Sequence, residues 1–396
     1  MFQLVLTKNE GKIYSSLFEE QRMIQVNVEK EEPGVVIGNI YVGKVKNIVK
    51  NINAAFVEIA DQQICYLSLN DPVPPTYTNG KKSGKIVVGD ELLVQVHQEA
   101  VKTKQPSVTT KIQLPGRYVV LTQGEARVGV SGKIQDPKQR LALQQAMEPY
   151  VSKEHKYGMV VRTNAKEVPI DCVVQEAETL SRIYLQLMEN GKYRTCFSMV
   201  YQAPCGFLCD IRDGYEQELE RIITDEEAIY ERVRTYLQQY QPENLDKLSF
   251  YEDPLLPLKR LYSLDTKIKK ALQERVWLDS GGYLVIQPTE ALTVIDINTG
   301  KSVGKKKNTE AHFLKINLEA AKEIARQLRL RNLSGIIVID FIDLSTKEAK
   351  EQLIQTLKQE IQKDPVKTVF VEMTKLNLVE LTRKKVRKPL HEQVKE

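Results

Sequence analysis

Residues 283–296 read Tyr283-Leu284-Val285-Ile286-Gln287-Pro288-Thr289-Glu290-Ala291-Leu292-Thr293-Val294-Ile295-Asp296, and residues 336–340 read Ile336-Ile337-Val338-Ile339-Asp340. The first segment has two apolar runs around a proline-containing turn, which predicts a β-hairpin. Its second run and the later segment are almost wholly apolar, as buried strands are. Each of these two predicted strands ends on an aspartate.

Between the two strands lies a segment with the periodicity of an amphipathic helix. From Asn317 to Leu333, small or apolar residues recur three or four positions apart, at Leu318, Ala321, Ile324, Ala325 and Leu328. Gly335 is the predicted stop of this helix. A helix that packs the two strands side by side would bring Asp296 and Asp340 together.

Two carboxylates at close range repel each other, and a divalent cation removes that repulsion. Mg²⁺ is commonly held by one or two carboxylates and keeps waters for a phosphate ligand and for activation. We therefore predict a magnesium site at Asp296 and Asp340. Asn298 would share a face with Asp296 if the strand continues that far, and could then orient its carboxylate. The alternative is that both aspartates are ordinary turn residues at strand ends.

The loop Thr299-Gly300-Lys301-Ser302-Val303-Gly304-Lys305 follows the first aspartate. It is not a nucleotide-binding P-loop, because three residues rather than four separate its glycines and Lys306 stands where Ser or Thr is required. A P-loop nucleotidase is therefore excluded. We interpret the loop, and Lys301 in it, as a basic clamp on a phosphate backbone.

Composition gives the broad class. A chain of 396 residues predicts two or more domains, and its net charge of +5 permits nucleic-acid binding without demonstrating it. No apolar run is long enough for a membrane span and the N-terminus has no secretory pattern, so we expect a cytoplasmic protein. The five cysteines lack a Cys-x-x-Cys pair, so neither disulfides nor a zinc site at Cys205 and Cys209 is expected. Basic runs such as Arg383-Lys384-Lys385 are interpreted as solvated faces.

The rest of the chain predicts a succession of smaller units. The first 32 residues form strands around the turn Asn9-Glu10-Gly11, and this meander must pack on a later segment because it is too small to stand alone. Pro33-Gly34 marks a boundary. Residues 112–205 alternate strands at 117–121 and 159–162 with helices at 140–147 and 172–190, and residues 215–240 look helical.

Five strands are predicted near residues 38–49, 54–59, 64–69, 92–97 and 107–110. This number and size match an OB-type barrel, which binds single-stranded nucleic acid on its strand face and loops. Phe56 and Tyr66 fall on neighbouring strands. Their rings either stack on bases or pack in the core, and spacing alone leaves both possibilities open.

Around the two predicted strands that end in aspartates, the sequence resembles the ribonuclease E/G family. The resemblance lies in Ser280-Gly281-Gly282-Tyr283-Leu284-Val285-Ile286, in Thr289 through Gly300, in Asn317-Leu318-Glu319-Ala320-Ala321 through Arg331, and in Ile339-Asp340-Phe341-Ile342-Asp343. It runs from the N-terminal strands to about Arg387. It implies an α+β multidomain protein: an RNase H-like domain (1–34 and 204–271) enclosing an S1-type OB domain (35–111) and a 5′-sensor domain (112–203), then a DNase I-like catalytic domain (272–396).

The resemblance also implies residue roles. Asp296 and Asp340 match the family's magnesium ligands, and Asn298 matches the asparagine that supports the first. In the S1-type domain, the RNA-contacting positions fall on Phe56, Tyr66 and Lys104. For a 5′-monophosphate pocket, the matching residues are Arg162, Thr163, Gly116 and Val120. The implied reaction is hydrolysis of AU-rich single-stranded RNA to 5′-phosphate and 3′-hydroxyl ends, in messenger decay and in ribosomal and transfer RNA maturation.

Two departures from the family pattern are clear. Where the family tends to have two arginines after a serine, this chain has Ser131-Gly132-Lys133, so Lys133 keeps a charge but not the bidentate geometry of arginine. No cysteine follows Cys209, so a zinc-linked dimer is not expected and any homo-oligomer would use another surface. The alternative function is a non-catalytic RNA-binding regulatory protein in which the carboxylates have no catalytic role.

Overall fold

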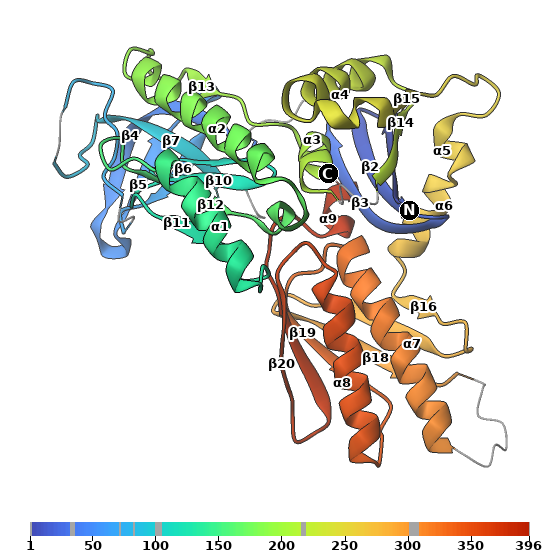
Figure 1. Ribbon diagram of the computed structural model, residues 1–396. Coiled ribbons are helices and arrows are strands. Elements are labelled where there is room, and N and C mark those ends of the chain that lie inside the picture. Colours follow the sequence, from blue (N-terminus) through green and yellow to red (C-terminus); the bar gives the residue numbers. More distant parts are fainter. Residues whose placement is uncertain are drawn as a thin grey trace. The chain divides into compact units, whose positions relative to one another are not determined.

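The computed structural model describes residues 2–31, 36–70, 73–81, 84–99, 105–214, 219–300 and 309–395. Its contacts divide the chain into two compact units, which are coloured along the sequence in Figure 1. The first unit combines Met1–Glu31 with Gly206–Glu396, and the second is Glu32–Cys205. The protein is a mixed α/β protein with several sheets.

The first unit contains a five-stranded sheet built from both ends of the chain. Its order is β15 (Leu248–Phe250), β14 (Leu219–Thr224), β1 (Phe2–Asn9), β2 (Lys12–Glu19) and β3 (Arg22–Lys30). β1 pairs with β14 in parallel, which confirms that the N-terminal strands pack on a later segment. The predicted turn between β1 and β2 is confirmed as well, with Glu10 and Gly11 both at positive φ.

The helix expected over residues 215–240 is partly wrong. Residues 215–218 lie outside the described part of the chain, Leu219–Thr224 is strand β14, and only Glu227–Tyr240 is helical, as α4. The charged residues of β14 concealed its short apolar run. Ile222 and Ile223 are buried because β14 lies between β1 and β15, a position that no local pattern reveals.

The second unit contains a closed five-stranded barrel of OB-like size, as predicted. Its strands are β4 (Ile40–Val49), β5 (Ala54–Glu58), β6 (Ile64–Ser68), β8 (Ser107–Thr109) and β7 (Glu91–Gln98), and β7 pairs back to β4. A further strand, β13 (Met199–Tyr201), adds to the outer edge of β4. The Pro33-Gly34 boundary lies outside the described residues.

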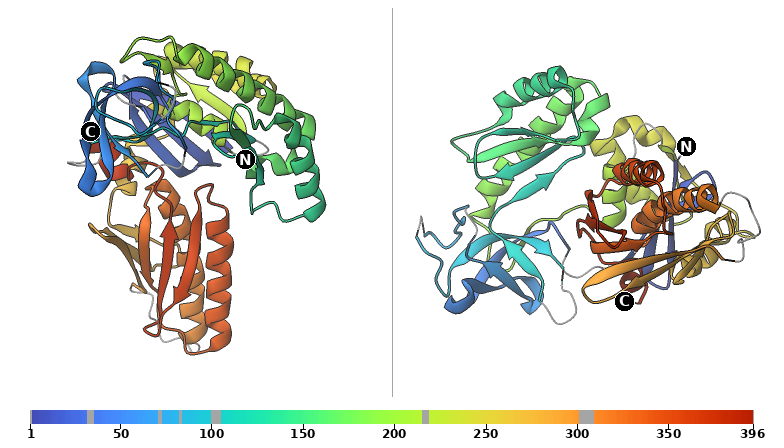
Figure 2. Two further views of the ribbon diagram at one scale, coloured as in Figure 1. Left: turned by 90° about the vertical axis from the view of Figure 1, so that its left-hand side faces the viewer. Right: turned by 90° about the horizontal axis from the view of Figure 1, so that it is seen from below.

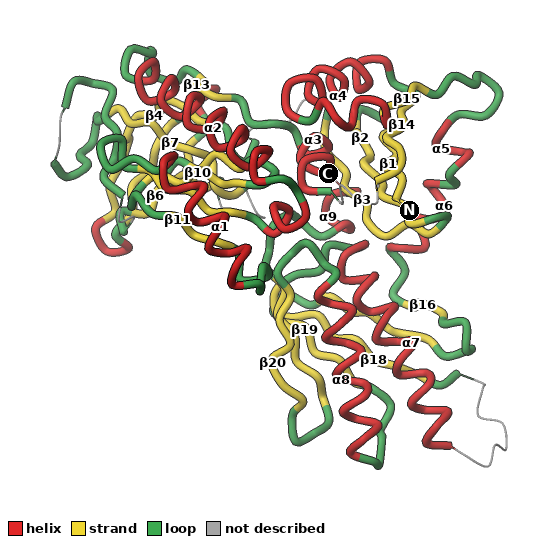
Figure 3. Tube along the Cα trace, viewed as in Figure 1, coloured by secondary structure: helices red, strands yellow, loops and turns green. Residues whose placement is uncertain are grey.

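A four-stranded sheet completes the second unit. Its order is β11 (Val128–Val130), β12 (Tyr157–Val161), β10 (Val119–Gln123) and β9 (Gln113–Pro115). Two helices, α1 (Pro137–Met147) and α2 (Ile170–Gly191), lie next to these strands in Figure 3 and bury Leu143 and Tyr184 in the same core. The predicted alternation of strands and helices in this segment is confirmed.

The six-stranded sheet of the first unit carries the two aspartates. Its order is β16 (Arg275–Trp277), β17 (Tyr283–Pro288), β18 (Leu292–Asn298), β19 (Gly335–Asp340), β21 (Leu378–Arg383) and β20 (Thr368–Met373). Helices α7 (Thr309–Leu330) and α8 (Lys347–Gln362) lie together on one side of it (Figures 1 and 2). Alternate strand residues, among them Ile295 and Ile339, form one core with these helices. The residues between them are half-buried or exposed on the opposite face, which we call the open face.

Helix α7 differs from its prediction at both ends. It starts at Thr309 and ends at Leu330, short of Leu333. Asn332 adopts a left-handed conformation, and Gly335 begins strand β19 instead of stopping the helix.

The other helices in the described part of the chain are α3 (Gly206–Asp213), α5 (Leu258–Leu261), α6 (Leu264–Ala271) and α9 (Leu390–Lys395). Short 3-10 turns lie at Lys50–Ile52, Ala60–Gln62, Glu148–Tyr150, Thr163–Glu167 and Pro242–Lys247.

The basic run near the C-terminus is not simply a solvated face. Arg383 is buried, and its guanidinium donates to Asp364 at 2.7 Å and to the carbonyl of Leu333. Arg387 pairs with Asp210 at 2.9 Å. Only Lys384 and Lys385 of the run are exposed, as the charge pattern had indicated. Within the described ranges, no helix is long and apolar enough to cross a membrane.

Candidate active site

Asp296 and Asp340 are direct neighbours across two strands. β18 and β19 are parallel and pair in register from Leu292 with Ile336 to Asp296 with Asp340, so the Cα atoms of the aspartates are separated by one strand spacing, about 4.8 Å. The residues before them, Ile295 and Ile339, are fully buried on the helix-covered side. Strand alternation therefore directs both carboxylates to the open face.

Asn298 lies on the same face and contacts the first aspartate. Its Nδ2 donates to Oδ2 of Asp296 at 2.5 Å. Close glycine packing holds this strand end: a Cβ on Gly282 would lie 2.8 Å from the carbonyl oxygen of Asn298, and one on Gly300 (φ +62°) would collide with the carbonyl of Gly281. The glycines thus allow the turn before β17 to lie against the end of β18.

Negative charge accumulates at this edge of the sheet. Burial raises the pKa of Asp340, and the nearby carboxylates of Asp296 and Asp343 raise that pKa further. Among the described residues no lysine or arginine forms an ion pair with either aspartate of the pair. The arrangement suits a divalent cation, which would relieve the mutual repulsion.

Helix α7 holds the loop that follows Asp340. Asn317, fully buried, donates from Nδ2 to the carbonyl of Ile342 at 2.7 Å and accepts from the Ile342 N–H at 3.1 Å. In the first turn of the helix, Glu310 accepts from the backbone and hydroxyl of Ser345 and from the N–H of Thr346. The backbone beyond Asp340 is therefore fixed at two points.

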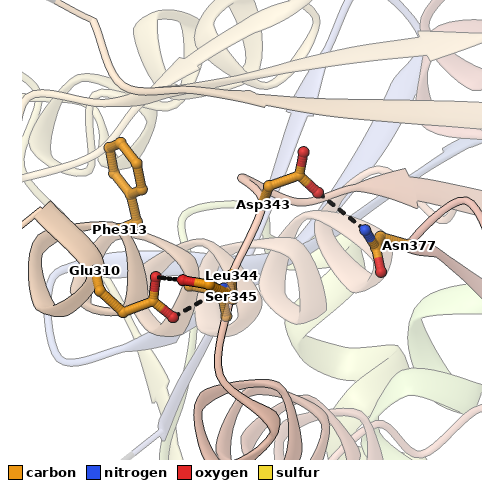
Figure 4. Close-up of a pocket in the computed structure, with 6 residues that line it drawn as sticks. All are labelled: Glu310, Phe313, Asp343, Leu344, Ser345 and Asn377. Carbon is orange, nitrogen blue, oxygen red and sulfur yellow. Dashed lines mark hydrogen bonds between the residues drawn. The ribbon is translucent and has the colours of Figure 1, made fainter.

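Asp343 lies in the middle of this loop, at a surface pocket of about 380 Å³ drawn in Figure 4. Its carboxylate accepts from Nδ2 of Asn377 at 3.1 Å, and Oδ1 of Asn377 accepts from Lys350. Figure 4 shows Glu310 directed at Ser345, and Asp343 directed at Asn377. Asp343 is exposed, and its charge acts on Asp340.

Sequence reasoning assigned no role to these supporting residues. Asn317 had a detectable signal, because it is a polar residue within the apolar stripe of a predicted helix. Glu319 also belongs to α7, and it accepts from the N–H of Asp279 at 2.5 Å beside the glycine turn. Glu310 and Asn377 had no local signal, since their partners lie more than thirty residues away in sequence.

The predicted RNA-contacting aromatics lie together on the barrel. Phe56 on β5 and Tyr66 on β6 are register partners, and their rings meet edge to face with centroids 6.4 Å apart. Both are half-buried, while the alternate residues Val57 and Cys65 are in the barrel core. The two rings are therefore on the outer surface. Lys104 and Lys301, also predicted to bind RNA, lie outside the described residues.

The predicted 5′-sensor residues gather around the ends of β10, β11 and β12. Arg162 donates from Nη1 to the carbonyl of Gly116 at 2.6 Å. The hydroxyl of Thr163 lies 3.0 Å from that of Ser131, which also accepts from the N–H of Lys133 at 3.3 Å. Val120 lies on β10 opposite Val160 of β12.

Glu176 of α2, which sequence reasoning missed, organises the same loop. Its carboxylate accepts from the N–H groups of Arg117, Tyr118 and Val119 at 2.6, 2.7 and 2.8 Å. A Cβ at Gly116 would lie 2.5 Å from Glu176 Cδ, which explains the glycine. Burial raises the pKa of Glu176 despite these bonds. The only sequence feature that could have identified Glu176 is its charge at a position on the buried side of a predicted helix.

A metal site must be judged from these side chains. Within the described ranges, no cluster of three or more His, Cys, Asp or Glu residues has metal-binding geometry. A Mg²⁺ site at Asp296 and Asp340 does not require such a cluster. Mg²⁺ is often held by one or two carboxylates, and water and substrate phosphate complete its coordination shell. The two carboxylates, which form no ion pair with any described lysine or arginine, therefore fit Mg²⁺.

A barrel of OB-like size and a register-matched pair of carboxylates suit an enzyme that cleaves nucleic acid. The chain belongs to the ribonuclease E/G family, whose model matches residues 113–386. It is an endoribonuclease of the ribonuclease E/G type. This finding decides against the non-catalytic alternative.

Several curated proteins are similar over nearly the whole chain. Ribonuclease G of Salmonella typhimurium (strain SL1344) is 35% identical over 373 residues, which are 92% of this chain and 76% of that protein. Ribonuclease G of Haemophilus influenzae is 35% identical over 97% of this chain and 79% of its own. Ribonuclease E of Synechocystis sp. is 34% identical over 90% of this chain and 53% of its own length.

Proposed function

We propose that this endoribonuclease hydrolyses AU-rich single-stranded RNA in a Mg²⁺-dependent reaction, leaving 5′-phosphate and 3′-hydroxyl ends, in messenger decay and in ribosomal and transfer RNA processing. The observation that carries the proposal is the register pairing of Asp296 with Asp340 on the open sheet face, with Asn298 bonded to the first. Family membership supports the same reaction.

The roles of the side chains follow from their contacts. Asp296 and Asp340 would hold Mg²⁺, which when bound supplies charge stabilisation at the phosphate and an acidified water. Asn298 occupies one oxygen of Asp296 and so orients the carboxylate. In the hydrolysis, the water oxygen bonds to phosphorus and the bond from phosphorus to the 3′ oxygen breaks. The 3′ oxygen then takes up a proton.

The other predicted domains support substrate binding in this proposal. The barrel acts as the S1-type domain, with Phe56 and Tyr66 stacking on bases and Lys104 and Lys301 contacting phosphates. The four-stranded sheet acts as the 5′-sensor, with Arg162, Thr163 and Lys133 around a terminal phosphate and with Gly116 and Val120 as its lining. The five-stranded sheet and the six-stranded sheet correspond to the RNase H-like and DNase I-like domains.

Cleavage of a labelled single-stranded RNA in Mg²⁺ and in EDTA tests the proposal. Asp296→Asn and Asp340→Asn are expected to abolish metal-dependent cleavage while RNA affinity stays within a few-fold of wild type. Asp246→Asn is the matched control, because Asp246 is an exposed aspartate of the same unit. Cleavage by either active-site variant at the wild-type rate, or undiminished cleavage in EDTA, would refute the proposal.

A further inference from the structure

Three side chains form a cluster at the edge of the six-stranded sheet, where Arg275 and Trp277 are exposed and Tyr283 is half-buried. The rings of Trp277 on β16 and Tyr283 on β17 have centroids 5.1 Å apart. The guanidinium of Arg275 lies 4.4 Å from the centroid of Tyr283 and 5.8 Å from that of Trp277. Trp277 is 64% exposed. We call these three residues the aromatic platform.

Strand register places the aromatic platform on the face of the carboxylates. Trp277 pairs with Tyr283, and Tyr283 pairs in turn with Asn298. In the adjacent row, Arg275 pairs with Val285, which pairs with Asp296. Register partners share a face, so Trp277 lies two strand spacings, about 10 Å, from Asn298. If the phosphate to be cleaved lies at the two aspartates, the base of a nearby nucleotide of the same strand would be at about this distance.

The platform contributes little to the core of the unit. Val276, between Arg275 and Trp277, packs on the opposite side against the core, and Leu278 is buried. Among the described residues no carboxylate forms an ion pair with Arg275. The two rings are inclined at 57° to each other, so the exposed Trp277 ring offers one face to a base, and Arg275, which has no ion-pair partner among the described residues, places a positive charge beside it.

We propose that the aromatic platform is a base-stacking subsite for single-stranded RNA: a nucleobase near the scissile phosphate stacks on Trp277, and Arg275 supplies positive charge to the strand. The proposal rests on the proposed function, because it uses Asp296 and Asp340 to place the phosphate. It adds a substrate-binding determinant on the six-stranded sheet, in addition to those proposed for the barrel.

Trp277 is the only tryptophan of the chain, so its fluorescence reports on the platform directly. The Asp296→Asn variant is titrated with a single-stranded RNA, and binding is followed in parallel by anisotropy of labelled RNA. Stacking is expected to quench the tryptophan emission. Replacing one nucleotide at a time by an abasic residue should remove the quenching at a single position near the cleavage site. Binding without a change in emission overturns the proposal.

Substitution gives the second test. Trp277→Ala is expected to weaken RNA binding about fivefold to a hundredfold, whereas Trp277→Phe keeps most of the affinity. Phe250→Ala is the matched control, because Phe250 is a partly exposed aromatic on a different sheet of the same unit. If Trp277→Ala binds RNA as tightly as the wild type does, the proposed base-stacking subsite is wrong. Absence of metal-dependent cleavage by the wild-type protein overturns the proposed function instead, so the two failures are distinguishable.

Discussion

Asn298 shows how much of the site depends on the alternation of a single strand. Ile295 and Ile297 point into the core, so Asp296 and Asn298 point outward together and come within hydrogen-bonding distance. The amide can donate to a carboxylate without adding charge to a region that already contains Asp340 and Asp343. An asparagine is thus a better neighbour here than another acid.

Replacing Asn298 is expected to impair cleavage without unfolding the protein. Asn298→Ala should lower the cleavage rate about 10- to 100-fold and raise the Mg²⁺ concentration needed for half-maximal rate, because Asp296 loses its orienting donor. Asn298→Asp should be worse, since it adds a fourth carboxylate to Asp296, Asp340 and Asp343. The Mg²⁺ dependence of initial rates measures both. Wild-type Mg²⁺ dependence in Asn298→Ala would contradict the role.

In the second unit, a single side chain also organises its surroundings: Glu176 holds the loop before β10. Three consecutive backbone N–H groups donate to it, yet burial keeps its pKa above the usual value. Between the ordinary and the folded pKa, the folded state binds more protons than the unfolded chain. The contribution of Glu176 to the free energy of unfolding therefore falls as the pH rises from its ordinary pKa to its raised pKa in the folded protein.

Glu176→Gln tests both the bonds and the pKa. The variant should lose about 1–3 kcal/mol of unfolding free energy, because an amide cannot accept from all three donors as well as a carboxylate does. Glutamine does not titrate, so the difference in unfolding free energy between wild type and variant should increase as the pH is lowered from about 7 to about 5. Urea denaturation at both pH values measures this difference. An equal difference at both would show that the pKa of Glu176 is not raised.

Helix α7 does more than cover one side of the six-stranded sheet. Its apolar residues, such as Ile316 and Ala320, are part of the core, while Glu310, Asn317 and Glu319 bind backbone groups on both sides of the aspartate pair. One rigid element thus holds the turn before β17 and the loop after β19. The geometry of the site depends on the placement of this helix.

Asn317→Ala is expected to lower both stability and activity. It leaves the N–H and the carbonyl of Ile342 without their partner, which costs about 1–3 kcal/mol. Loosening the loop behind Asp340 should also reduce the cleavage rate of the protein that remains folded. Thermal denaturation and single-turnover rates measure the two effects. Lys322→Ala, at an exposed position of the same helix, is the control and should change neither.

At the scale of the whole molecule, the first unit is assembled from distant parts of the chain. Leu390 of α9 is fully buried in the core that also contains Val5 and Phe18 of the N-terminal strands. Gln393 accepts from the N–H of Val28 on β3 at 2.8 Å. Arg387 and Asp210 form another link between segments that are far apart in sequence. Both termini are therefore needed for this unit.

Leu390→Ala should destabilise the first unit selectively. Removing a buried leucine side chain costs about 2–5 kcal/mol. Hydrogen exchange is expected to speed up in β1, β2 and β3, whereas the barrel strands of the second unit keep their protection. Leu255→Ala, at a position that is 89% exposed, should leave both units unchanged. Equal loss of protection in both units would show that they unfold together.

Prediction from the sequence succeeded where a local pattern decides which face a residue occupies. The barrel strands, the β17–β18 hairpin, β19 and the helical core of α7 were found in this way. It failed for β14, whose apolar run is short and charged on one side, and for Arg383, whose burial depends on Asp364. Those cases depend on partners that are remote in sequence.

The sequence by itself determined that Asp296 and Asp340 end two buried strands and that Asn298 follows on the same face, because the twofold alternation of a strand is a local property. The tertiary structure decided what surrounds them. It set the register that pairs the two aspartates, and it brought Asn317 and Glu310 to the loop after Asp340. It also placed Trp277 in the row of Asn298. These contacts depend on how whole elements pack, which spacing along the chain does not specify.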